Sequence, residues 1–241
     1  MLPLPPCCAD PAPGESRPPH DVPAVTQYAS PELINAFAYE GRDTGDDPAW
    51  ATSGAATREE YRCWAGHLCG MACLRMVLLH RDRYAPTLFA LADGVRKYEG
   101  YTEGPEGIKG LIYGPFARYT HHAHNLPATV HPKLTIDGLT GLLDDGHLVM
   151  ASVHKTIRTP DQDPPRRGGH LVLVRGRTET GDLVFNNPSG HTPESREAVL
   201  PAGRFADYFA GRGVSLNPRP TTAGSPTGEA AIRTAPVSPS I

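Results

Sequence analysis

The stretch CGMACLRMVLLH at residues 69–80 decides how the rest of this 241-residue chain is organised. Its Leu, Met, Ala and Arg residues are good helix formers, and its apolar side chains recur at helical spacing. The pattern predicts a buried helix with Cys69 in its first turn. Unpaired backbone N–H groups and the helix dipole favour a thiolate there, so Cys69 is a candidate nucleophile. The alternative is a buried structural cysteine. Gly70 beside it permits close approach of another chain or a substrate.

Two later segments supply possible partners for this cysteine. The run GGHLVLV at residues 168–174 places His170 at the start of a predicted strand, and LVFNNP at residues 183–188 ends a second strand at Asn187. A helix-start Cys followed by His and Asn is the chain order of papain-like nucleophilic sites. If the loop between the strands is centred on the turn, His170 lies directly opposite Asn187. An Asn there orients the imidazole toward a thiol.

Four other histidines compete with His170 for the role of base. His67 lies in the loop before the helix, two residues from the cysteine, where it is poorly placed to receive a proton across a cleft. His80 is eleven residues along the helix, or about 16 Å away at 1.5 Å per residue. His147 and His154 flank a predicted strand and are more typical of core or rim positions. His170 is therefore the best candidate.

Two groups of potential metal ligands lack the usual spacing. The group of Cys63, His67, Cys69 and Cys73 has no C-x-x-C knuckle. The group of His121, His122 and His124 has no carboxylate or cysteine beside it at ligand spacing. We therefore expect no metal and no cofactor.

Composition argues against several kinds of partner. The 23 basic and 26 acidic residues are interspersed and give a net charge of −3, so no basic face for nucleic acid and no polybasic membrane anchor is expected. The N-terminus has no basic region followed by an apolar run, and no apolar stretch reaches the roughly 18 residues of a membrane span. Five cysteines, an odd number, fit a reducing compartment. We expect a cytoplasmic protein; no particular oligomeric state is indicated.

The Pro and Gly content predicts one folded domain between two tails. Residues 1–24 and 217–241 are expected to be disordered, and residues 25–216 to fold. Ser30 and Thr87 are predicted helix caps, and Thr135 lies near a predicted helix start. Besides 69–80, helices are predicted near 30–37, 87–99, 108–119, 134–144 and 204–211, strands at 147–154, 170–175, 182–187 and 214–216, and loops at 100–114 and 158–169.

The run CGMACLRMVL at 69–78, with GHLVLV at 169–174 and then Asn187-Pro188, resembles the family-39 cysteine peptidases and their relatives. These papain-like proteins are best known for trimming leader peptides after double-glycine motifs. The resemblance covers roughly residues 48–216. It implies an α+β, papain-like fold, with a helical half packed on an antiparallel sheet. It also implies hydrolysis of a peptide bond through a thioester, with Cys69 as nucleophile, His170 as general base then acid, and Asn187 as the residue that orients it.

One position departs from the family pattern. The family commonly has a Gln six residues before the nucleophile to stabilise the oxyanion, and Cys63 stands there. Losing one such donor typically costs about 10²–10³-fold in rate, although His67 or Trp64 could act as substitute donors. This departure supports one alternative, a degenerate peptidase that binds a peptide without cleaving it. A second alternative is an acyltransferase that passes the acyl group of the same thioester to an amine, since the sequence does not show which acceptor the cleft holds. A peptide or protein substrate is the expected partner.

Overall fold

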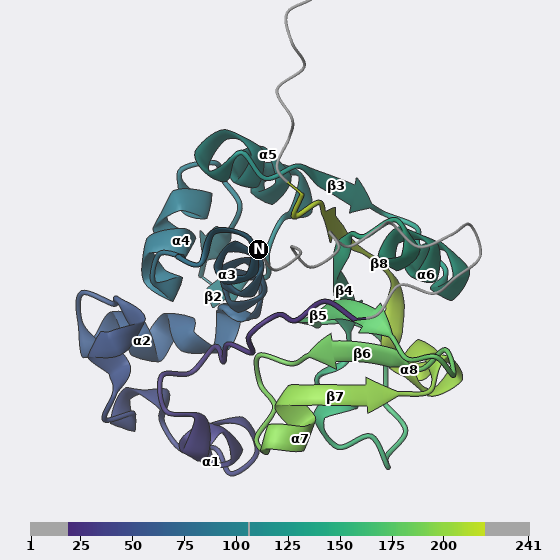
Figure 1. Cartoon of the computed structure of the whole chain (residues 1–241). Coiled ribbons are helices and arrows are strands. Elements are labelled where there is room, and N and C mark those ends of the chain that lie inside the picture. The colour runs from purple at the N-terminus through teal and green to yellow at the C-terminus, as the bar shows by residue number, and fades with distance from the viewer. Residues whose placement is uncertain (1–18, 106, 220–241) are drawn as a thin grey trace, which may run out of the picture.

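A six-stranded antiparallel sheet forms the centre of the molecule. The structure is a computed structural model and describes residues 19–105 and 107–219. The strand order is β3-β8-β4-β5-β6-β7 (Figure 1). The strands are β3 (Ala128–His131), β4 (Leu148–Val153), β5 (His170–Arg177), β6 (Leu183–Asn186), β7 (Glu197–Leu200) and β8 (Phe209–Leu216).

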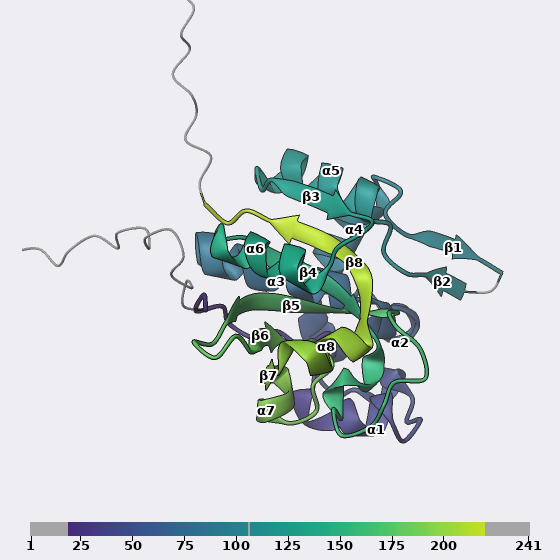
Figure 2. The same ribbon diagram turned by 90° about the vertical axis from the view of Figure 1, so that its right-hand side faces the viewer.

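Helices cover both faces of this sheet. Helices α2 to α5 gather on one side of it (Figure 1), while α6 and α8 bury their apolar residues with the opposite face. The helices are α1 (Ile34–Ala38), α2 (Arg58–Trp64), α3 (Cys69–Asp82), α4 (Leu88–Arg96), α5 (Tyr113–His124), α6 (Ile136–Asp144), α7 (Pro193–Arg196) and α8 (Ala202–Tyr208). A separate hairpin of β1 (Thr102–Gly104) and β2 (Gly107–Lys109) extends beside α5 (Figure 2).

The central strands β4 and β5 carry continuous apolar runs, at 148–151 and 171–174, because both faces of the sheet are covered there. In β5, Leu171 and Leu173 pack on the α3 side, whereas Val172 and Val174 pack on the α6 and α8 side. Strand β4 divides its residues in the same way, and all six are buried. A strand buried on both faces reads as a continuous apolar run rather than an alternating one. This arrangement confirms the predicted α+β fold class.

The local predictions for helices are confirmed where the sequence has strong signals. The stretch at 69–80 forms α3, which is buried over most of its length. Thr87 accepts a hydrogen bond from the backbone N–H of Ala90 and so caps α4, and Thr135 caps α6 through the N–H of Gly138. Among the described helices none alone is long and apolar enough to cross a membrane; Arg58–His67 and Cys69–Asp82, bent by 83°, meet that length and composition test only as a pair.

Several predicted boundaries are wrong. The loop expected at 100–114 contains the β1–β2 hairpin, and the helix expected at 108–119 begins later, at Tyr113, and ends at His124. Residues 209–211 leave the predicted helix and begin β8, an eight-residue strand inside the sheet rather than a short final one. Helix α2 and strands β3 and β7 were not predicted, because each is too short to show a clear hydrophobic period.

The predicted pairing of β5 with β6 is wrong by two residues. In the structure Leu173 pairs with Asn186, and the register shifts between Val174 and Gly176. A bulge places an extra residue in one strand, so the hairpin is not symmetric about its loop. Continued to the start of β5, the observed register brings Ser189, rather than Asn187, opposite His170.

Residues 19–29 form an ordered segment that we call the N-terminal strap. The prediction of disorder up to residue 24 is therefore wrong for residues 19–24; residues 1–18 and 220–241 lie outside the described chain. The His20 N–H donates to the Arg175 carbonyl of β5, and the Asn186 side chain donates to the Val22 carbonyl. At its other end, the Ala29 N–H donates to the Tyr61 hydroxyl of α2. The strap thus joins the sheet to the helical half (Figure 1).

A buried carboxylate holds the segment after the strap. Asp47 is fully buried and accepts hydrogen bonds from the Ser30 hydroxyl at 2.6 Å, the Tyr61 hydroxyl at 2.6 Å, and the backbone N–H groups of Ser30 and Ala49. Burial alone would raise the pKa of Asp47, but these donors outweigh it and lower the pKa. Ser30, the predicted helix cap, makes no capping bond and binds this carboxylate instead.

We expect Asp47→Ala to destabilise the fold by about 3 kcal/mol or more, because it removes bonds to a charged acceptor and leaves buried donors unpaired. Urea unfolding at pH 7 measures this loss. The control is Asp46→Ala at the neighbouring exposed position, whose one ion pair within residues 19–105 and 107–219 is a 4.0 Å contact with Arg42; it should change stability by less than about 0.5 kcal/mol. Equal losses in the two variants would contradict a structural role for the Asp47 carboxylate.

Candidate active site

Cys69 is the first residue of α3, at the floor of a cleft between this helix and the sheet. The residue before it, Leu68, makes no side-chain cap, so the first N–H groups of the helix are left to the cleft. A Cβ at Gly70 would lie 2.6 Å from a methyl group of Leu111, so the segment before α5 packs closely over the helix at this glycine, and a larger residue would displace the Leu111 side chain. The cysteine itself is half-buried.

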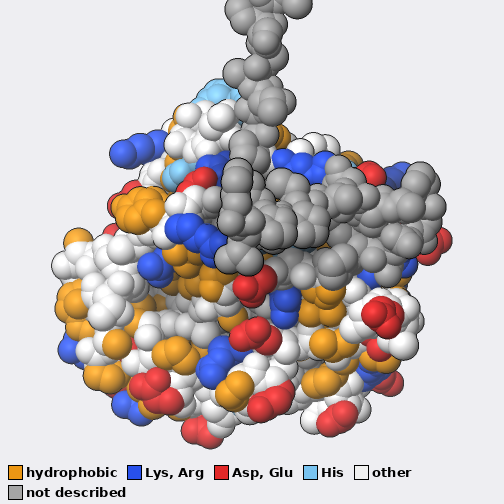
Figure 3. All heavy atoms as spheres, viewed as in Figure 1, with side chains coloured by type: hydrophobic (Ala, Val, Ile, Leu, Met, Phe, Trp, Pro, Cys, Tyr) orange, Lys and Arg blue, Asp and Glu red, His pale blue; other side chains and the backbone are white. Residues whose placement is uncertain are grey.

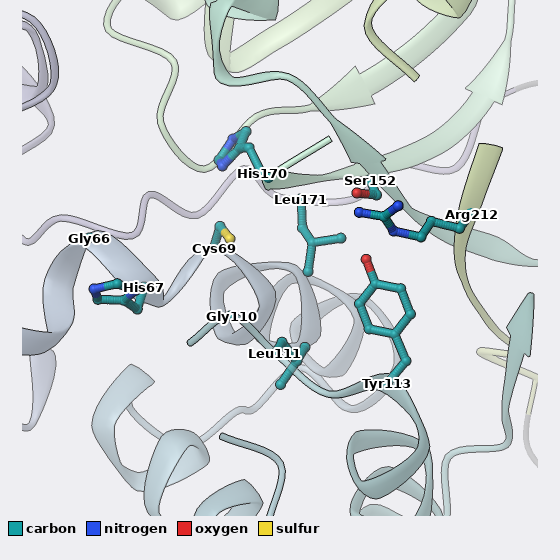
Figure 4. A pocket seen from close by; sticks show the side chains of 11 residues that line it. Gly66, His67, Cys69, Gly110, Leu111, Tyr113, Ser152, His170, Leu171 and Arg212 are labelled. Atoms are coloured by element: carbon teal, nitrogen blue, oxygen red, sulfur yellow. The ribbon is translucent and has the colours of Figure 1, made fainter. Parts of the chain in front are cut away.

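His170 enters the cleft from the first position of β5. It follows Gly168 and Gly169, which have φ of +80° and +98°, a backbone conformation that favours glycine. Both Cys69 and His170 line one cavity of about 360 Å³, and Figure 4 shows their side chains on its facing walls. The remaining lining residues are Gly66, His67, Gly110, Leu111, Tyr113, Ser152, Gly169, Leu171 and Arg212.

Asn187 holds His170 from behind. It follows the last residue of β6, is 2 % exposed, and places its Oδ1 2.9 Å from His170 Nε2. The same Oδ1 accepts the Ser189 N–H at 3.1 Å, so the amide oxygen must face this way. Nε2 therefore carries the proton and donates it, and the other ring nitrogen, Nδ1, is left as the proton acceptor.

Ser189 is a member of this site that the sequence analysis did not identify. Its hydroxyl lies 3.1 Å from His170 Nε2 and donates to Asn187 Oδ1 at 3.3 Å, and the side chain is 1 % exposed. These hydrogen bonds connect all three side chains, so Ser189 helps to orient both His170 and Asn187. A correct strand register was the only signal that would have found it.

Burial makes the resting site neutral. Burial lowers the pKa of His170 to about 3, and the nearby charge of Arg158 adds to this effect, while the hydrogen bond with Asn187 opposes it. Burial also raises the pKa of the Cys69 thiol, although backbone N–H groups of Leu171, Gly70 and Cys69 itself lower it in part. The predicted thiolate at the helix start is therefore not the favoured resting state.

Of the four rival histidines, only His67 lines the cleft, beside Cys69, and burial lowers its pKa. His80 Nδ1 donates to the Asp21 carbonyl of the strap, and His154 binds Thr156 at the start of a 3₁₀ turn. Over residues 19–105 and 107–219, no three His, Cys, Asp or Glu side chains are grouped so as to hold a metal ion.

Cys63 lies away from the cleft, although its sequence position is that of the family's oxyanion glutamine. It is exposed on α2, its sulfur contacts Glu59, and it does not line the cavity. A different glutamine lies near the nucleophile loop. Gln27 of the strap is buried, and its Nε2 donates to the carbonyl of Ala65, four residues before Cys69, at 2.9 Å. Trp64 is packed between Tyr101 and Arg96 in the core.

Residues 49–214 match the model of the Peptidase_C39 like family. The chain belongs to this family. Among solved structures, this C39-like chain is similar to the peptidase domain of Streptococcus ComA, a bi-functional ABC transporter involved in a quorum sensing pathway, with a TM-score of 0.45 and 16 % identity over 64 % of this chain and 93 % of that one. A putative C39-like peptidase from Bacillus anthracis gives a TM-score of 0.45 and 15 % identity over 64 % and 90 %. Comparison with curated proteins gives no significant match.

The low pKa of His170 makes stability depend on pH. Because the folded value of about 3 lies below the ordinary 6.5, the unfolded chain binds this proton first as pH falls. Stability is therefore full above pH 6.5 and declines from there toward pH 3. We expect the wild type to lose about 1.4 kcal/mol more per pH unit than His170→Gln between pH 6 and 4.5, measured by urea unfolding. Parallel curves for the two proteins would contradict a buried, neutral His170.

Proposed function

We propose that this C39-like protein is a cysteine peptidase that hydrolyses a peptide bond through a thioester at Cys69. The observation that carries the proposal is the 2.9 Å bond from His170 Nε2 to Asn187 Oδ1, which leaves Nδ1 as an acceptor in the cleft that Cys69 shares. A buried imidazole held in one tautomer by an amide is the arrangement that a general base in such a site needs. Family membership supports the same chemistry.

The proposed reaction begins from a neutral thiol and a neutral imidazole. As Cys69 Sγ attacks the substrate carbonyl carbon, the thiol proton passes to His170 Nδ1, and the carbonyl oxygen becomes an oxyanion. The C–N bond then breaks, the leaving amine takes the proton from Nδ1, and a thioester remains. Water attacks the thioester, gives its proton to Nδ1, and the thiol recovers that proton as the acid product leaves.

Proton transfer needs Cys69 and His170 closer than in the free protein. Among the described residues, no hydrogen bond joins the Cys69 thiol to the His170 ring. Such bonds are often long in unliganded sites and shorten when substrate binds. Substrate also excludes water from the cleft, which strengthens the attraction between a forming thiolate and imidazolium. The proposed enzyme thus forms its reactive pair during the reaction rather than before it.

Turnover of an unbiased peptide library tests the proposal. We expect the wild type to cleave some members, Cys69→Ala to lose this activity entirely, and Cys63→Ala, at an exposed cysteine outside the cleft, to keep it. Iodoacetamide should label Cys69 faster as pH rises. If Cys69→Ala binds library peptides as tightly as the wild type and the wild type cleaves none, the protein is a peptide-binding module. Product masses with an added amine separate hydrolysis from acyl transfer.

We further propose that Gln27 supplies the side-chain oxyanion donor that the sequence assigns to position 63. Its Nε2 has two hydrogens, and the bond to Ala65 uses one of them. The Gln27 side chain is buried, and its backbone N–H donates to the carbonyl of Pro188, the residue after Asn187, so the strap runs next to both the loop before Cys69 and the segment that holds His170. Together with the Cys69 N–H, the Gln27 side-chain amide would stabilise the tetrahedral oxyanion.

Replacing this donor should lower kcat without removing the nucleophile. We expect Gln27→Met, which keeps the volume but removes the amide, to reduce kcat by about 10²–10³-fold while Cys69 can still be alkylated. The comparison variant is Cys63→Gln, which restores the family residue at an exposed position and should leave kcat unchanged. A rate gain in Cys63→Gln, or a fully active and folded Gln27→Met, would contradict the assignment.

A further inference from the structure

The cleft extends past Cys69 to a second polar group that the proposed reaction does not use. Figure 4 shows the Tyr113 hydroxyl, the Ser152 hydroxyl and the Arg212 guanidinium gathered at one end of the cavity, beyond Leu171. They come from the start of α5, from β4 and from β8. Three elements distant in sequence therefore direct hydrogen-bonding groups to one place beside the nucleophile. We call this end the Arg212 subsite.

A bulge in β8 creates the position of Arg212. Ala151 of β4 pairs with Gly213, and Val153 pairs with Phe209. An advance of two residues along β4 is therefore matched by four residues along β8, which leaves two extra residues in β8. Gly211, within this bulge, has φ of +64°. Bulges beside active sites commonly redirect a side chain. Here the extra residues lift Arg212 out of the regular sheet surface and place it over Ser152, the residue of β4 that lies inside the irregular stretch.

The segment that carries His170 leaves room for this group. A Cβ at Gly168 would lie 3.1 Å from an Arg212 guanidinium nitrogen and 3.2 Å from Ser152 Oγ. Gly168 stands two residues before His170, so the subsite begins where the catalytic strand begins. The distance between the subsite and the proposed base is thus fixed by the backbone rather than by a mobile loop.

Arg212 has no ion-pair partner in the described part of the chain. Seven other described arginines do contact a carboxylate, among them Arg62, Arg96 and Arg204, whereas Arg212 is exposed at the mouth of the cleft and contacts none. Positive and negative side chains are also interspersed on the face shown in Figure 3. By contrast, no described residue that lines the cleft is Asp or Glu, and Arg212 is its one arginine or lysine. The planar guanidinium matches a carboxylate with two parallel hydrogen bonds, and flanking hydroxyls can donate to the same group.

We propose that the Arg212 subsite binds a carboxylate of the substrate, so that the protein selects peptides with an acidic group close to the bond presented to Cys69. This inference rests on the proposed function in one respect, that the bond presented to Cys69 is the one cleaved. Binding of the carboxylate to Arg212 does not depend on it. The carboxylate is either an Asp or Glu side chain or the C-terminus of a short peptide. Both have the same chemistry, and the experiment separates them.

Alkylation of Cys69 tests the subsite without requiring peptidase activity. The first pair of probes is N-iodoacetyl-glutamate α-amide and its neutral isostere N-iodoacetyl-glutamine α-amide, which represent an acidic side chain. The second pair is N-iodoacetylglycine and its amide, which represent a C-terminus. In each reaction the Cys69 thiolate forms an S–C bond and iodide leaves. Peptide-resolved mass spectrometry gives the rate at Cys69. For each pair of probes we compare the acid-to-amide ratio of alkylation rates at Cys69 with the same ratio at exposed Cys63. For the pair whose carboxylate reaches Arg212, we expect the ratio at Cys69 to be about tenfold higher.

Arginine variants decide what causes that preference. Arg212→Gln should abolish it, Arg212→Lys should keep part of it, and Arg83→Gln, which removes an equal charge from an exposed site at the far end of α3, should leave it unchanged. A preference for the glutamate probe alone assigns the subsite to an acidic side chain, and a preference for the glycine probe alone assigns it to a C-terminus. Equal acid-to-amide ratios in the wild type and Arg212→Gln overturn the proposal.

Peptide cleavage then distinguishes this inference from the proposed function. If acidic peptides are cleaved with a lower KM than their amide counterparts, and Arg212→Gln raises that KM while kcat is nearly unchanged, both stand. If the alkylation preference is present but no peptide is cleaved, the subsite stands and the peptidase fails. If peptides are cleaved with no preference for an acid in either assay, the peptidase stands and the subsite fails.

Discussion

Burial of helix α3 against the sheet is the constraint on which the rest of the structure depends. Eight of the fourteen residues of α3 are buried, and Cys73 touches the Leu171 carbonyl through its sulfur at 3.8 Å. Each large apolar side chain buried there contributes about 1.5–3 kcal/mol. The contact fixes the axial position of the helix on β5, and so places the start of the helix, at Cys69, beside the start of the strand, at His170. The two candidate catalytic residues thus lie at the edge of a packed interface rather than within it.

How much of the structure the sequence predicts depends on how far along the chain each signal acts. The apolar run of α3, the cap at Thr87 and the helix start near Thr135 depend on only a few neighbouring residues, and the sequence predicts them correctly. The sequence does not predict the β5–β6 register, because the bulge near Gly176 lies where the strap crosses β5, and a Cβ on Gly176 would lie 2.4 Å from Pro19 Cα. His170 and Asn187 are not paired across the strands as predicted, but a side-chain hydrogen bond still joins them, beyond the paired residues of β5 and β6.

The same limit applies to the proposed oxyanion donor, Gln27. A rule that assigns the oxyanion donor to the sixth residue before the cysteine assumes that this residue lies in the cleft. Here α2 occupies the chain before α3 and turns Cys63 outward, while the strap brings Gln27, 42 residues before Cys69, to the carbonyl of Ala65. Distance along the chain is thus a poor guide to distance in the site. Cys63 by itself is weak support for a degenerate enzyme.

Electrostatics in the cleft are decided by desolvation rather than by the helix dipole. A helix start stabilises a negative charge by about 0.3–1 kcal/mol, less than one pKa unit, whereas full burial shifts a group by several units. Burial accordingly raises the pKa of Cys69 and lowers that of His170, and both groups are neutral at rest. Arg158, which is 7 % exposed, opposes an imidazolium and favours a thiolate, so it does not stabilise the pair as a whole. A bound carboxylate would supply the missing negative charge. Held at Arg212, it would favour the positive imidazolium as the thiol proton moves, and so link recognition of an acidic substrate to formation of the reactive pair.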